Sequence, residues 1–96
     1  MPLFVALGKA TEEGRRNLVG LQQRHRAAVR RAEKAGARVV GSYALLGHYD
    51  YLAILDCPDL STAMKVLARE AAGGNIQYET LAAMPLDEFA ALVEEE

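Results

Sequence analysis

The spacing of apolar residues alternates along this chain between the two-residue period of a β-strand and the 3.6-residue period of an α-helix, and the order of these changes constrains the fold most strongly. Short apolar runs typical of strands occupy residues 3–8, 37–46, 51–57 and 75–83. Stretches with helical spacing occupy residues 18–35 and 60–71, and a short apolar helix is expected after Pro85. The predicted order is strand, helix, strand, strand, helix, strand and a terminal helix.

Capping and turn residues indicate where several of these elements begin. Thr11, followed by an acidic pair, predicts a helical turn in the polar loop after the first strand. Asp59 is placed as the N-cap of the second long helix. The apolar stripe of that helix, which assigns Met64 to the core, consists of Leu60, Ala63, Met64, Leu67, Ala68 and Ala71. The GHYD segment, residues 47–50, has the length and composition of a tight hairpin connection.

This order of elements is the ferredoxin-like βαββαβ arrangement, an α+β fold with a four-stranded antiparallel sheet. Two helices cover only one face of such a sheet, and the other face is normally polar. Residues 3–8 and 51–57, however, are apolar on both alternating sets. An identical subunit is the simplest cover for a second apolar face, so the pattern predicts a homodimer through the sheet faces, or a higher homo-oligomer built from such dimers.

Length and composition narrow the function classes. The 96 residues suit one domain, 1–96, and 51% hydrophobic with 25% charged residues is globular composition. A net charge of −2 argues against a dedicated nucleic-acid binder, and no apolar run reaches the ~18 residues of a membrane span. With Cys57 alone and two histidines, the chain lacks the ligands for a Cys/His zinc site, and it has no phosphate loop. We therefore expect no metal, no cofactor and a cytoplasmic location.

The GHYD segment has two interpretations. In the structural one, Gly47 adopts a positive φ, the Asp50 carboxylate accepts backbone N–H groups and Tyr49 covers the end of the sheet. In the functional one, His48 and Asp50 form an acid–base pair with Tyr49 as a hydrogen-bond donor. Turn chemistry alone explains the glycine and the aspartate, so the hypothesis is that Asp50 is structural.

Other polar residues also have more than one interpretation. His25 lies in the stripe of the first long helix, where a buried neutral histidine or one at the edge of the stripe is expected. Asn75 and Glu79 share a face of the last strand, either lining a pocket or facing solvent along an edge strand. The arginines of the first helix are typical of a solvated face.

The stretch LGHYDYLAILDCPD is similar to the motif for which the GYD domain family is named. The flanking residues that agree with it are Thr11, Gly14, Asn17, Arg24, Gly41, Tyr43, Gly74, Asn75, Glu79 and Thr80. This resemblance covers nearly the whole chain. It implies a dimeric α/β barrel, in which two ferredoxin-like sheets pack face to face, in a family of unassigned function. Related dimeric barrels include cofactor-independent monooxygenases, isomerases and ligand-sensing modules, but fold does not imply function.

Three functions therefore stay open. The leading hypothesis is a protein that binds or senses a small molecule between the sheet and the helices, with Tyr43, Tyr49, Tyr78 and Glu79 lining the pocket. His48 and Asp50 are added as candidate ligand-binding residues. The alternatives are a cofactor-independent enzyme of the monooxygenase or isomerase kind and a structural, partner-binding subunit.

Overall fold

Four antiparallel strands form one sheet in the order β2-β3-β1-β4, in a computed structural model that describes residues 2–95. The strands are β1 (Leu3–Ala10), β2 (Arg38–Ala44), β3 (Tyr51–Asp56) and β4 (Ile76–Ala83). The helices are α1 (Glu12–Arg16), α2 (Leu21–Lys34), α3 (Leu60–Ala71) and α4 (Leu86–Glu94). This is the element order and α+β class that the sequence predicts. Within the described residues, no helix has the length and hydropathy needed to cross a membrane.

Two helices begin at the capping residues that the sequence indicates. The Thr11 hydroxyl accepts the N–H of Gly14 at the start of α1, and Asp59 Oδ1 accepts the N–H of Thr62 at the start of α3. The prediction of a tight hairpin around GHYD is wrong, because the whole of residues 45–50 joins β2 to β3. Leu45 N–H donates to the Asp50 carbonyl at 2.8 Å, so backbone pairing continues one step beyond β2 before the loop opens.

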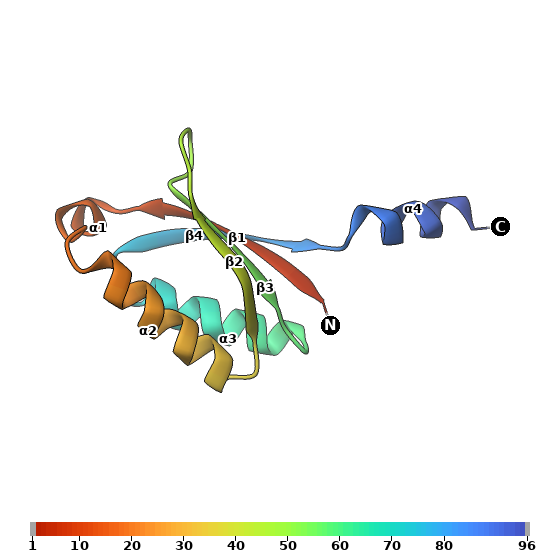
Figure 1. Cartoon of the computed structure of the whole chain (residues 1–96), viewed down its shortest axis with the longest axis horizontal. Helices are drawn as coiled ribbons and strands as arrows, with labels where there is room; N and C mark the ends of the chain where they lie inside the picture. The colour runs from red at the N-terminus through yellow and green to blue at the C-terminus, as the bar shows by residue number, and fades with distance from the viewer. Residues whose placement is uncertain (1, 96) are drawn as a thin grey trace.

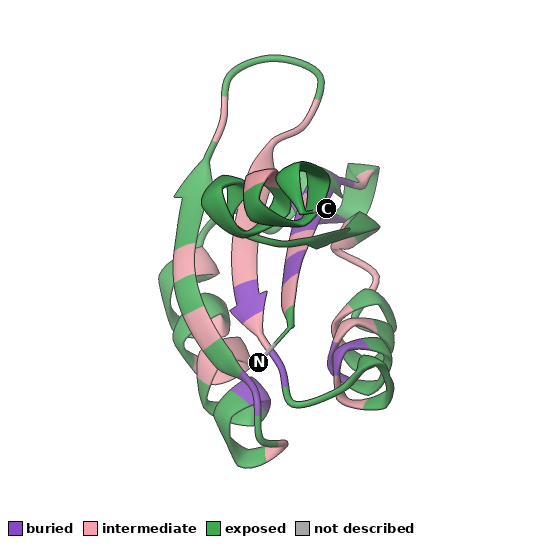
Figure 2. Cartoon of the chain, turned by 90° about the vertical axis from the view of Figure 1, so that its right-hand side faces the viewer, coloured by how far each residue is buried: buried purple, intermediate pink, exposed green. Residues whose placement is uncertain are grey.

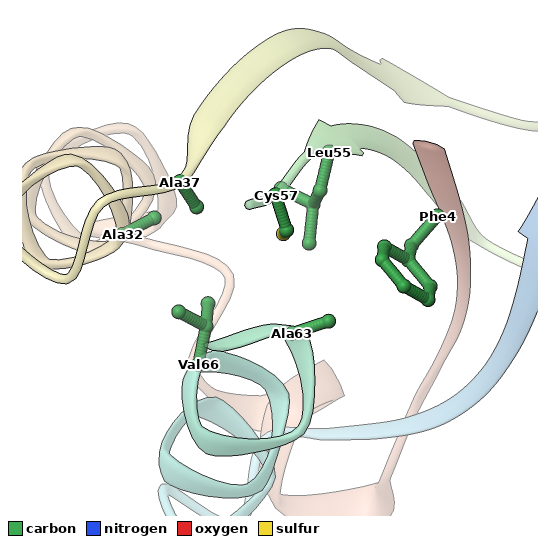
Figure 3. Close-up of a cluster of buried hydrophobic side chains, with 7 residues drawn as sticks. All are labelled: Phe4, Ala32, Ala37, Leu55, Cys57, Ala63 and Val66. Atoms are coloured by element: carbon green, nitrogen blue, oxygen red, sulfur yellow. The ribbon is translucent and has the colours of Figure 1, made fainter. Parts of the chain in front are cut away.

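Helices α2 and α3 lie on the same side of the sheet (Figure 1). On that side, Phe4 of β1 is paired with Leu55 of β3 and with Ala82 of β4. The core lies where the end of α2 and the start of α3 meet these strands (Figure 3). Its buried members are Phe4, Ala32, Ala37, Leu55, Cys57, Ala63 and Val66. Most of them are small, so the single chain has a modest core.

The assignment of Met64 to the core is wrong. Met64 is 63% exposed and Leu60 is 61% exposed, whereas Val66 is buried. Apolar residues cover more than one side of α3, and periodicity does not say which edge of so wide a stripe faces the sheet. The contacts with Leu55 and Cys57 select the edge that carries Ala63 and Val66.

The side of the sheet opposite the helices is apolar at its centre. The sequence predicts this because both alternating sets of residues in β1 and β3 are apolar. Cross-strand pairing aligns Val5 with Ile54 and Leu81 on this side, and Leu7 with Leu52. Charged and polar residues border these positions, with the Arg38–Asp56 ion pair at one end and Lys9 paired with Gln77 at the other. We call this surface the open sheet face.

Helix α4 stands apart from the rest of the chain. It continues outward from the end of β4, beyond the sheet and away from α2 and α3 (Figure 1). Viewed end-on, it is coloured as exposed over almost its whole length (Figure 2). Ala90 alone among its residues is partly buried.

Candidate functional site

A cavity of about 570 Å³ separates the first part of α2 from the sheet. The core fills only the end of this layer near Ala32 and Leu55, and the cavity takes the other end. Its lining includes small residues that face each other across the gap, Ala6 and Ala53 from the strands and Ala28 from α2. Small side chains on both walls leave space that larger ones would fill.

Two tyrosines are among the polar residues on the sheet side of the cavity. Tyr51 and Tyr78 flank Gly8 on β1, to which both are paired. Burial raises the pKa of Tyr78 to about 12, with smaller contributions from Glu70 and Tyr51. Tyr78 is therefore a neutral hydrogen-bonding group at any physiological pH.

An ion pair bridges the two helices at the border of the cavity. Arg31 of α2 donates to both carboxylate oxygens of Glu70 of α3, from Nε at 2.9 Å and from Nη2 at 2.8 Å. These hydrogen bonds, together with the negative charge of Glu70, raise the pKa of Arg31. This bidentate pair links α2 to α3 at the border of the cavity.

His25 borders the same cavity from α2. It is exposed, so of the two positions expected for it the structure rules out burial and agrees with the edge of the stripe. An exposed histidine at the border of a cavity is available to a bound molecule. The periodicity of the helix does not distinguish this position from one in the core.

The structure does not bring the predicted pocket residues to one place. Tyr78 and Tyr43 border the cavity. The Tyr43 ring, however, lies over Gly41, where an added Cβ would be 2.8 Å from its hydroxyl. Glu79 is paired with Leu7 on the open sheet face, and Tyr49 donates its hydroxyl hydrogen to Glu79 Oε1. This bond raises the pKa of Tyr49.

The GHYD loop is attached to β1 through Asp50. Its Oδ2 accepts the N–H of Ala10 at 2.8 Å, and its own N–H donates to the Gly8 carbonyl at 2.9 Å. Gly47 has φ +123°, the positive value expected of it. His48 lies edge-on to Tyr49, with ring centroids 4.9 Å apart. The bonds of Asp50 are of the structural kind, although the N–H that it accepts lies on β1 rather than inside the turn.

Residues on which the family resemblance rests converge where α1 meets the start of β4. Thr11 N–H donates to the Asn75 carbonyl at 3.0 Å, and the Thr11 hydroxyl donates to the Gly74 carbonyl at 2.7 Å. A Cβ on Gly14 would lie 2.0 Å from the Asn75 carbonyl oxygen, so only glycine permits this approach. Asn17 Nδ2 adds a longer contact of 3.4 Å to Asn75 Oδ1. Asn75 therefore belongs to a junction between elements and also borders the cavity, whereas Glu79 lies on the open sheet face.

Comparisons with known proteins agree with this architecture. The crystal structure of TTHA0845 from Thermus thermophilus superimposes with a TM-score of 0.57 at 18% identity, over 88% of this chain and 95% of that one. At this identity the likeness shows the fold alone, a ferredoxin-like α+β arrangement. The family model of the GYD domain matches residues 4–93. The chain belongs to the GYD domain family.

A curated relative from Thermus thermophilus is described as a glutamine synthetase and cystathionine beta-lyase binding protein. It is 32% identical to this chain over 92 residues, which cover 95% of the chain and 97% of the relative. The two proteins therefore match over nearly their full lengths.

Sequence reasoning missed several features of the site. Arg31 and Glu70 lie 39 positions apart, and no local signal pairs them. The sequence assigns Tyr51 to a strand but not to a pocket, because alternation places it on a face without saying whether the helices fill the space above it. Both features depend on how α2 is tilted against the sheet, which tertiary packing decides.

Proposed function

We propose that this protein is a binding subunit that associates with copies of itself through the open sheet face and, as an oligomer, binds other proteins. The observation that carries the proposal is the relative named for binding glutamine synthetase and cystathionine beta-lyase, which matches this chain almost end to end. Enzymes of those two kinds are the first partners to examine.

The open sheet face supports the self-association. Its central residues, Val5, Leu52 and Ile54, are only partly covered in the single chain. A stable interface withdraws about 800 Å² from each partner and combines an apolar centre with a polar rim. The apolar strands bordered by Arg38 and Asp56 have that composition. Two such faces packed together would form the dimeric α/β barrel that the family resemblance implies.

The cytoplasm is the compartment that we propose for this subunit. Cys57 is unpaired and fully buried, and burial raises the pKa of its thiol. An unreactive free thiol in the core is typical of a protein that works in a reducing compartment.

A capture experiment tests partner binding. The purified chain is immobilised and exposed separately to purified glutamine synthetase and cystathionine beta-lyase from the same organism, with an unrelated oligomeric enzyme as the control. Retention of at least one of the two enzymes at a fixed molar ratio, with no retention of the control, supports the proposal. If the wild-type oligomer retains neither enzyme, this function is rejected.

The cavity favours small-molecule binding as a second candidate function. Its volume of about 570 Å³ lies in the range of about 300–1,000 Å³ usual for ligand sites. Its apolar walls carry a few polar groups, among them Tyr51, Tyr78 and His25. That combination suits an organic molecule that bears one or two polar groups.

Native mass spectrometry of protein purified from its own host tests this second function. A reproducible added mass on the wild-type chain, lost in Ala28→Phe, is the expected result, because the phenyl ring would occupy the cavity. Ala68→Phe is the matched control, since Ala68 is exposed on α3. Wild-type protein without added mass, or the same added mass on both variants, excludes the cavity as the site.

A further inference from the structure

Helix α4 has an apolar side that residues 2–95, the part of the chain described, leave uncovered. Leu86, Phe89, Ala90 and Val93 recur at steps of three and four residues and so share one side of the helix. Leu86 is 77% exposed and Phe89 is 52% exposed. An isolated amphipathic helix this short is marginal in water, so its stability requires a surface on which this side can pack.

An apolar groove of about 460 Å³ lies between α3 and β4 on the helix-covered side of the sheet. It is lined by Phe4, Leu60, Ala63, Met64, Leu67 and Ala82, with Thr80 at its edge. Leu60 and Met64 are the residues that α3 leaves exposed when it packs on the core. Their exposure follows from the gap between the helix and β4.

We propose that α4 of one copy of this chain docks into the α3–β4 groove of a second copy, with Phe89 as the residue that fills it. This proposal rests on the self-association proposed above but uses another surface, since the groove and the open sheet face lie on opposite sides of the sheet. An aromatic ring withdraws about 150–250 Å² from water when it is buried, which makes Phe89 the anchor of a helix-in-groove contact.

The direction of the chain favours the groove of a second copy over that of the same chain. Met84 and Pro85 alone connect β4 to α4, and Pro85 is extended, with φ −56° and ψ 141°. The helix therefore leaves along the direction of β4 and away from its own α3 (Figure 1). Returning to its own groove would require a reversal within these two residues, whereas the observed direction presents α4 to a neighbour.

The charges of the two helices are complementary. The polar residues of α4 and its C-cap are all acidic, namely Asp87, Glu88, Glu94 and Glu95. On α3, Lys65 and Arg69 lie one helical turn apart and are exposed. In the part of the chain that the structure describes, neither of them takes part in a salt bridge. At about 100° per residue these two side chains lie on the side of α3 away from Leu60, Met64 and Leu67, so the opposite charges favour the approach of α4 to α3 but do not set its orientation in the groove.

Cysteine cross-linking between chains tests the proposal. One chain carries Met64→Cys and the other carries Phe89→Cys, and the two are mixed in the reduced state and then oxidised. Because each chain has a single new cysteine and Cys57 is fully buried, a mixed disulfide reports contact between copies. The matched control replaces Phe89→Cys with Ala91→Cys, which places the thiol on the other side of the same exposed helix.

A mixed covalent dimer from Met64→Cys with Phe89→Cys, and little or none with Ala91→Cys, is the expected result. Equal cross-linking of both pairs, or of neither, overturns the proposal. A chain that carries both Met64→Cys and Phe89→Cys and forms an internal disulfide as a monomer would show that α4 occupies its own groove. Repeating the mixed experiment with Ile54→Lys in both chains separates this contact from the one through the open sheet face. Because Ile54→Lys disrupts only the contact through the sheet, the cross-link between α4 and the groove is expected to persist.

Discussion

Replacing Gly14 with alanine tests the junction between α1 and β4. The added Cβ would lie 2.0 Å from the Asn75 carbonyl oxygen and 2.9 Å from its carbon, so the backbone at Asn75 has to move. That movement lengthens the bonds from Thr11 N–H to Asn75 and from the Thr11 hydroxyl to Gly74. Two weakened hydrogen bonds cost about 2 kcal/mol together, and the steric strain costs about 1–3 kcal/mol more.

The higher helix propensity of alanine offsets about 1 kcal/mol of this cost, which leaves a net loss of about 2–4 kcal/mol in the free energy of unfolding. Urea unfolding, followed by circular dichroism at one fixed protein concentration, measures this loss and keeps the contribution of self-association constant. For a domain of this size, a loss of about 3 kcal/mol lowers Tm by roughly 12–24 °C.

Gly36→Ala is the matched control. Gly36 has φ +97° but no atom within 4 Å of an added Cβ, so alanine there meets only backbone strain of about 1–2 kcal/mol. If Gly14→Ala is no less stable than Gly36→Ala, the close approach to Asn75 does not constrain the fold and the reasoning is refuted.

Three further predictions concern single side chains. Asp50→Ala leaves the buried Ala10 N–H without its acceptor and should lower the free energy of unfolding, measured in urea, by about 1–3 kcal/mol. Asp50→Asn retains an acceptor and should cost less. Equal losses for the two variants would contradict the role given to this bond. The hydrogen bond from Thr62 N–H lowers the pKa of Asp59 below its ordinary value of 3.8. The extra stability of wild type over Asp59→Ala should therefore be complete above pH 3.8 and should shrink as the pH falls through the lower pKa of the folded state. A stability difference that stays constant down to pH ~2 would refute this. Ultraviolet titration of wild type should show a tyrosine that ionises near pH 12, and this ionisation should be missing from Tyr78→Phe. Because the pKa of Tyr78 is raised in the folded state, the free energy of unfolding should fall as the pH rises from about 10 to 12.

The order of the elements was predictable because it depends on local periodicity. Strands β1 and β3 are short apolar runs, and Asp59 marks the start of α3 where the structure has it. The apolar second face of the sheet was also predictable, because residues of a strand point in turn to opposite sides and both sets are apolar in β1 and β3. These features need no knowledge of how distant segments meet.

The site was less predictable because it depends on packing between distant segments. Met64 and Val66 are both apolar positions of α3, and only the position of the sheet decides that Val66 is buried and Met64 exposed. His25 borders a cavity because small residues such as Ala6 and Ala28 face each other across it, which no pattern within one helix reveals. Tyr49 and Glu79 meet on the open sheet face through a loop longer than the tight turn predicted for it.

The mass of the assembled protein tests the central claim, association through the open sheet face, most directly. Sedimentation equilibrium on the wild type and on Ile54→Lys, which puts a charge opposite Val5 at the centre of that face, measures this mass. We predict a wild-type mass equal to two chains or a multiple of two, and a reduced mass for Ile54→Lys with unchanged circular dichroism. A wild-type mass of one chain, near 10.4 kDa, at micromolar concentration would contradict the account.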